Sequence, residues 1–146
     1  MQNCLEREIN ILHITALHSK KYGSIEKWMV HLAKVCKDRK YKIVFSLRGE
    51  PTNKSFLDDL RSTDAIVDIT QENFGALTLF SHARNLIKKY EINIIHSHFS
   101  PACHYANLAG YLSGIKGRFW TIHSMSEIDK HPYCRQRLIA LKQQIS

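Results

Sequence analysis

A chain of 146 residues, 44% of them hydrophobic, has the size of one domain and can bury one core of ordinary size. It contains no run of about 18 apolar residues, and its first residues mix both charge signs, so we expect neither a membrane-spanning helix nor a secretion signal and predict a cytoplasmic protein. The formal net charge of +8 would suit RNA, anionic lipid surfaces or phosphorylated small molecules, but the basic residues form no single block, and we expect no nucleic-acid partner.

Strands and helices alternate along the first half of the chain. A run rich in β-branched residues, Ile9–Thr15, predicts a buried strand, and apolar residues spaced three and four apart predict a helix from about Ser24 to Arg39. The next elements expected are a strand at Lys42–Leu47, a short helix around Ser55–Ser62 and a strand at Ala65–Ile69.

The second half continues the same alternation. We expect a helix over Ala76–Tyr90, a strand at Ile92–His96, a helix over Pro101–Leu112, a strand at Arg118–Ile122 and the beginning of a further helix over Tyr133–Ile145. This order predicts an α/β domain with an open, mostly parallel, Rossmann-like sheet and helices on both faces.

The four cysteines are far apart and include no C-x-x-C pair, so we expect reduced thiols and neither a metal knuckle nor a redox dithiol. Two of them, Cys36 and Cys103, fall on the predicted apolar faces of helices.

Ligands of open parallel sheets bind at the carboxyl ends of the strands. A glycine, Gly23, stands there ahead of the first helix, where a close backbone approach and the helix dipole would attract a phosphate or carboxylate. The alternative interpretation is that Gly23 and Ser24 only cap the helix and that Glu26 favours its dipole.

Histidines follow two other strands. His96 and His98 should lie on one side of the fourth strand, and His98 and His123 nearest the ligand edge. A metal site is not expected, because no suitably placed acidic ligand accompanies these histidines. Hydrogen bonding or proton transfer to a ligand is the favoured role, with structural packing the alternative for His13 and His96.

Basic and aromatic residues mix near the first helix: Lys20, Lys21, Tyr22, Lys27 and Trp28. We call this set the basic patch. This pattern is typical either of a solvated surface or of a site of peripheral contact with the inner face of a membrane.

Four motifs in order, Ile-Leu-His-Ile-Thr, Gly-Ser-Ile-Glu-Lys, Ile-Ile-His-Ser-His-Phe-Ser and Phe-Trp-Thr-Ile-His-Ser, resemble the N-terminal, acceptor-side domain of GT-B fold, family-4-like retaining glycosyltransferases over residues 9–125. The resemblance implies that Gly23 and Ser24 lie beside the diphosphate of a nucleotide-sugar. It also implies that His123 is the active-site histidine and that His98 and Ser124 lie on the acceptor side. Ser24 and Ser124 replace glycines of the family, whose mechanism needs no metal cofactor.

The implied function is retaining sugar transfer from a nucleotide-diphosphate sugar to a glycan or lipid-linked acceptor, as in surface polysaccharide biosynthesis. We expect residues 1–146 to be a single domain, truncated at its C-terminal end and without the donor-binding C-terminal domain. Alone it should be inactive unless a separate chain supplies that domain. The alternative is a non-catalytic α/β module that binds an anionic ligand or a protein partner. No Walker loop, nucleophile elbow or dinucleotide glycine fingerprint supports another enzyme class.

Overall fold

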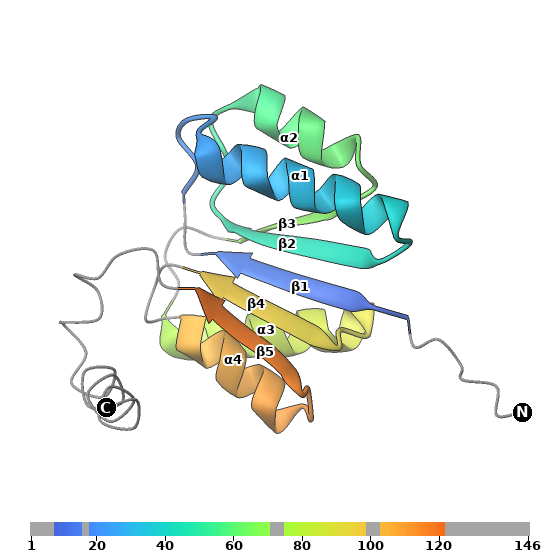
Figure 1. Ribbon diagram of the computed structural model, residues 1–146. Coiled ribbons are helices and arrows are strands. Elements are labelled where there is room, and N and C mark those ends of the chain that lie inside the picture. The colour runs from blue at the N-terminus through green and yellow to red at the C-terminus, as the bar shows by residue number, and fades with distance from the viewer. Residues whose placement is uncertain (1–7, 16–17, 71–74, 99–102, 122–146) are drawn as a thin grey trace, which may run out of the picture.

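The computed structural model describes residues 8–15, 18–70, 75–98 and 103–121 (Figure 1). The helix expected over Tyr133–Ile145 lies outside these ranges. Within them the strands are β1 (Asn10–Thr15), β2 (Lys42–Arg48), β3 (Ile66–Thr70), β4 (Ile94–His98) and β5 (Gly117–Thr121). The helices are α1 (Ser24–Asp38), α2 (Lys54–Arg61), α3 (Ala76–Tyr90) and α4 (Cys103–Leu112).

The five strands form one parallel sheet in the order β3-β2-β1-β4-β5. The chain therefore builds outward from β1 to β3, returns to the other side of β1, and continues through β4 to β5. The predicted fold class, an open parallel α/β sheet with helices on both faces, is confirmed. The reversal of direction places a topological switch point between β1 and β4, where sheets of this kind bind ligands at their carboxyl edge.

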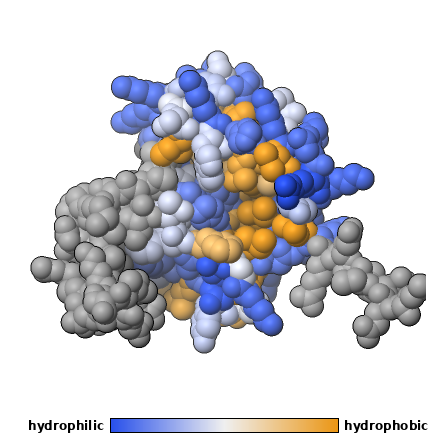
Figure 2. Space-filling model, in the orientation of Figure 1, coloured by the Kyte–Doolittle hydropathy of each residue, from blue (hydrophilic) through white to orange (hydrophobic). Residues whose placement is uncertain are grey.

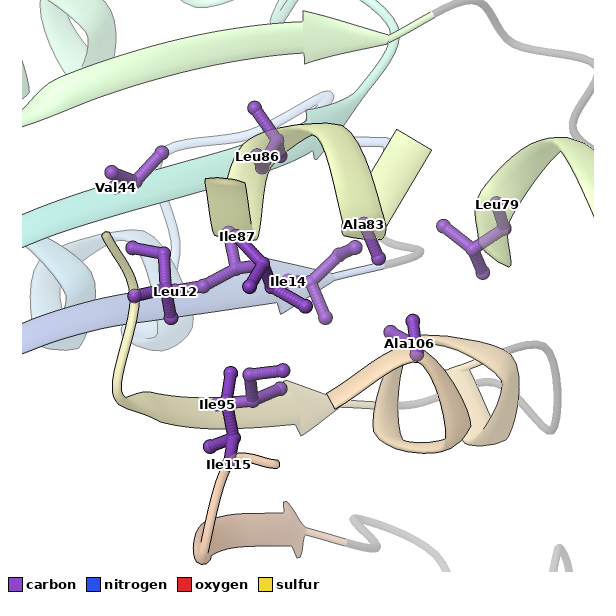
Figure 3. Close-up of a cluster of buried hydrophobic side chains, with 12 residues drawn as sticks. Leu12, Ile14, Val44, Leu79, Ala83, Leu86, Ile87, Ile95, Ala106 and Ile115 are labelled. Atoms are coloured by element: carbon purple, nitrogen blue, oxygen red, sulfur yellow. The ribbon is translucent and has the colours of Figure 1, made fainter. Parts of the chain in front are cut away.

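The helices lie in two layers, with α1 and α2 on one face of the sheet and α3 and α4 on the other (Figure 1). Each face has its own apolar core, because successive side chains of a strand point to opposite sides. Figure 3 shows Leu12, Ile14 and Ile95 packed toward α3 and α4. Phe45 belongs to the other core, beneath α1 and α2.

Small residues let α4 approach the sheet closely. Ala106 and Ala109 are fully buried, and a Cβ added to Gly110 would lie 2.5 Å from Cδ1 of Ile95. A side chain at this position would have to displace Ile95. Because glycine has none, the helix can pack directly on β4.

The fourth strand begins and ends two residues later than the sequence predicted. Glu91 adopts a left-handed conformation at the end of α3, and the amide of Ile92 still bonds to the carbonyl of Ile87. Pairing with β1 therefore starts only at Ile94. At the other end, pairing continues as far as His98, which lies opposite Thr15 and is the last residue of β4.

The face that carries α1 is covered unevenly. Figure 2 shows hydrophobic residues at the surface of this side of the molecule, over the sheet. Phe119 of β5 is on this face, beside His96, and is 57% exposed. Among the described residues, none of the helices is long and apolar enough to cross a lipid bilayer.

Candidate functional site

A pocket of about 300 Å³ opens at the carboxyl edge of the sheet, at the switch point between β1 and β4. Three neighbouring strands form its floor and the first turns of α1 form one wall. Its lining consists of His13, Thr15, Ser24, Ile25, Trp28, Met29, His96, His98 and Thr121.

Three histidines meet in this pocket, and we call His13, His96 and His98 the histidine cluster. Parallel pairing of β1 and β4 sets His13 directly beside His96, while alternation brings His98 to the same face. The ring centroid of His98 lies 4.3 Å from that of His13 and 4.1 Å from that of His96. His13 and His98 are buried, and one ring nitrogen from each of the three lies within 4.8 Å of the others.

Trp28 covers the histidine cluster from α1. Its indole lies 5.3 Å from the His13 ring and 5.5 Å from the His98 ring, measured between centroids, and it remains 40% exposed. The side chain that the sequence assigned to the basic patch is therefore also a wall of the pocket.

Tyr22, a second member of the basic patch, is also held by a contact within the chain. The Tyr22 hydroxyl donates a hydrogen bond to the carboxylate of Asp59 on α2. This bond, with smaller contributions from desolvation and from the charge of Asp59, raises the pKa of Tyr22. Lys20, Lys21 and Lys27 are exposed.

The start of α1 is held by a buried carboxylate. Glu26 accepts hydrogen bonds from the Ser19 hydroxyl at 2.6 Å and from the Gly23 amide at 2.9 Å. This arrangement reaches back across the first turn like a capping box, in which the residue at the third helical position bonds to the N-cap amide. Gly23 is therefore the N-cap of α1, with Glu26 bonded back to its amide, and the residues of α1 that line the pocket are Ser24, Ile25, Trp28 and Met29.

The predicted site residues fall into three groups. Ser24 and His98 line the pocket, whereas Gly23 is the N-cap of α1 and is not one of the lining residues. His123 and Ser124 lie outside the described residues. Thr121, the last residue of β5, does line the pocket.

Sequence reasoning treated His13 as packing and Trp28 as surface, and missed both as pocket residues. One signal was present for His13, because alternation along the strand puts it on the same side as Thr15, which ends at the ligand edge. The contact with His96 required knowing that the first and fourth strands are neighbours.

A separate polar cluster links β2, β3 and α3. The Nε2 atom of His82 lies 2.8 Å from a carboxylate oxygen of Asp68 and 3.4 Å from the hydroxyl of Ser46. In a catalytic triad the histidine uses one ring nitrogen for the acid and the other for the nucleophile. Here both contacts involve the same nitrogen, so the cluster fastens α3 to the sheet and is not arranged as a triad.

No family model and no curated protein matches this sequence. Solved structures do match. A glycosyltransferase from Rickettsia africae is 19% identical with a TM-score of 0.56, covering 77% of this chain and 29% of its own. MurG of Acinetobacter baumannii is 11% identical with a TM-score of 0.55, covering 78% and 35%. The lipopolysaccharide outer core galactosyltransferase WaaB is 15% identical with a TM-score of 0.61, covering 86% and 36%.

At these identities the likeness shows a shared fold. The chain spans about a third of the length of each of these structures. It has the Rossmann-like α/β fold found in GT-B glycosyltransferases, with the pocket and the start of α1 at the carboxyl edge of its sheet.

Proposed function

We propose that this chain is the N-terminal, acceptor-side domain of a family-4-like retaining glycosyltransferase, which transfers a sugar from a nucleotide-diphosphate sugar to a glycan or lipid-linked acceptor. One observation carries the proposal: in a domain with the fold of glycosyltransferases, the pocket lies at the switch point beside the start of α1. That position combines a concave, mostly apolar surface with the positive end of a helix dipole.

The donor diphosphate would lie at the start of α1. Negative charge accumulates on the departing diphosphate during transfer, and preorganised amides stabilise such charge without a metal ion. The Gly23 amide already donates to Glu26, so in this proposal Gly23 provides room for close approach while the amides of Ser24 and Ile25 contact the phosphate. His123 would face the transferred sugar, and His98 and Ser124 would line the acceptor side.

A second domain would complete the site. Because the chain spans about a third of the matched glycosyltransferases, we propose that the donor-binding domain is a separate unit, on the same or another polypeptide. We expect no sugar transfer by residues 1–146 alone.

Amide NMR tests the phosphate site directly. Titration of the chain with UDP, GDP and ADP should shift the amide signals of Ser24 and Ile25, and the corresponding nucleosides should not. The start of α3 is a matched control, because Gly75 also caps that helix without a side-chain hydrogen bond. Equal responses at both helices would indicate non-specific anion binding and favour the non-catalytic module, and no response at α1 would contradict the phosphate site.

Sugar transfer must be measured on the complete enzyme. In the polypeptide or complex that contains the donor-binding domain, His123→Ala should lower kcat/KM by about 100-fold or more, as loss of a group that acts on the reacting centre does. His31→Ala, on the exposed side of α1, is the control and should leave kcat/KM unchanged. Unchanged transfer by His123→Ala would remove His123 from the site.

A further inference from the structure

The histidine cluster has the composition of a metal site. Its three imidazoles come from two interior strands, β1 and β4, so their backbones are paired with a neighbouring strand on both sides. In the part of the chain that the structure describes, each of these three histidines places one ring nitrogen within 4.8 Å of the nitrogens of the other two. None of the described residues that line the pocket is a lysine or an arginine, so none of them repels a cation.

The spacing of the three nitrogens fits a small transition-metal ion after modest side-chain rotation. Zinc binds histidine nitrogen at about 2.0–2.1 Å with tetrahedral geometry, which places the nitrogens roughly 3.4 Å apart. The observed limit of 4.8 Å exceeds that separation by an amount that rotation about the side-chain torsions can close. Since the described residues of the pocket lining include no carboxylate, magnesium and calcium, which prefer oxygen ligands, are poor candidates.

Two neighbours would support such a site. The Thr121 hydroxyl lies 2.7 Å from Nε2 of His96, a contact that orients that ring; with Nε2 donating to the hydroxyl, Nδ1 is the nitrogen that can bind a metal ion. Partners of this kind on the second ring nitrogen are typical of metal-bound histidines. Trp28 covers the cluster and would shield a bound ion from bulk water.

We propose that His13, His96 and His98 bind one divalent transition-metal ion, with zinc the best fit. Three protein ligands leave the fourth tetrahedral position open toward the pocket, where it can hold water or an oxygen atom of a ligand. The proposal departs from the metal-free site that the resemblance implied. It does not rest on the proposed function, since metal binding is measured without any sugar substrate.

The test uses the whole chain, stripped of metal and then titrated with Zn²⁺ or Co²⁺. Calorimetry should give one ion per chain, and the cobalt form should show the visible absorption of a tetrahedral site. Replacing His13, His96 or His98 singly by glutamine should weaken binding by about tenfold or more, because loss of even an outer partner of a ligand has an effect of this size. His31→Gln, on the exposed side of α1, is the control and should bind as the unsubstituted chain does.

A second measurement needs no substitution, so it decides the question even if a variant does not fold. NMR of the imidazole nitrogens should show zinc-dependent shifts for His13, His96 and His98 in the unsubstituted chain. Absence of binding, binding that survives all three substitutions, or shifts confined to other histidines would each overturn the proposal and leave the cluster as core packing.

Discussion

Removing the carboxylate of Glu26 should loosen the start of α1 and the pocket wall that it forms. The side chain is buried, and its two oxygens accept separate hydrogen bonds from Ser19 and Gly23. Glu26→Ala deletes both bonds at once, while Glu26→Gln keeps the shape but replaces one acceptor by a donor.

The size of the effect follows from these contacts. A hydrogen bond to a charged group contributes about 1.5–3 kcal/mol, and a carboxylate in the first turn adds about 0.3–1 kcal/mol through the helix dipole. Part of this is recovered in Glu26→Ala, because the Ser19 hydroxyl also lies 3.3 Å from the Lys21 carbonyl and the Gly23 amide is only partly buried. We therefore expect Glu26→Ala to lower the free energy of unfolding by about 2–4 kcal/mol, and Glu26→Gln by roughly half as much.

Urea denaturation followed by circular dichroism measures these losses. Ser19→Ala and the double variant with Glu26→Gln complete a cycle that isolates the coupling between the two side chains. Glu50→Ala is the control for an exposed acid and should change the free energy of unfolding by no more than about 0.5 kcal/mol. A Glu26→Ala variant as stable as that control would refute the view that this carboxylate organises the start of α1.

Three further results are expected. Gly110→Ala should lower the free energy of unfolding by about 1–3 kcal/mol through overpacking against Ile95, less about 1 kcal/mol gained in helix propensity. Urea denaturation should show that Gly110→Ala carries no overpacking penalty in an Ile95→Val background, and equal effects in both backgrounds would contradict the close contact. Burial raises the pKa of the Cys36 thiol, so the folded chain favours the protonated form. The stability that this contributes is present below the pKa of an exposed thiol, about 8.5, and should be lost as the pH rises from there toward the raised pKa of the folded chain. The decline should be smaller in Cys36→Ala, and parallel pH profiles of the two chains would rule out this contribution. Replacing the lysines of the basic patch by glutamine should abolish salt-sensitive pelleting with anionic liposomes, and an unsubstituted chain that does not pellet would remove the membrane hypothesis.

The histidine cluster shows where reasoning from the sequence stopped. Alternation placed His96 and His98 on one face of their strand, and the structure confirms it. The expected start of that strand was wrong by two residues, because the left-handed Glu91 delays pairing until Ile94, and its expected end was wrong because pairing with β1 continues to His98. The contact between His13 and His96 could not be predicted, since it depends on which strands are neighbours.

Only part of the role of Glu26 could be predicted from the sequence. Its position in the first turn of a helix predicted a favourable charge, which is a local property. Its burial and its bond to Ser19 depend on how the preceding loop folds back over the helix, and no local pattern encodes that path.

The sequence by itself determined the alternation of strands and helices, the apolar face of each helix and the edge of the sheet at which a ligand would bind, because backbone preferences and hydrophobic periodicity act over a few residues. Only the tertiary structure decided that β1 lies between β2 and β4, and therefore that His13 meets His96 and His98 beneath Trp28. The physical reason is that strand order and register are set by packing and pairing between segments far apart in the chain, which the local pattern of neither segment contains.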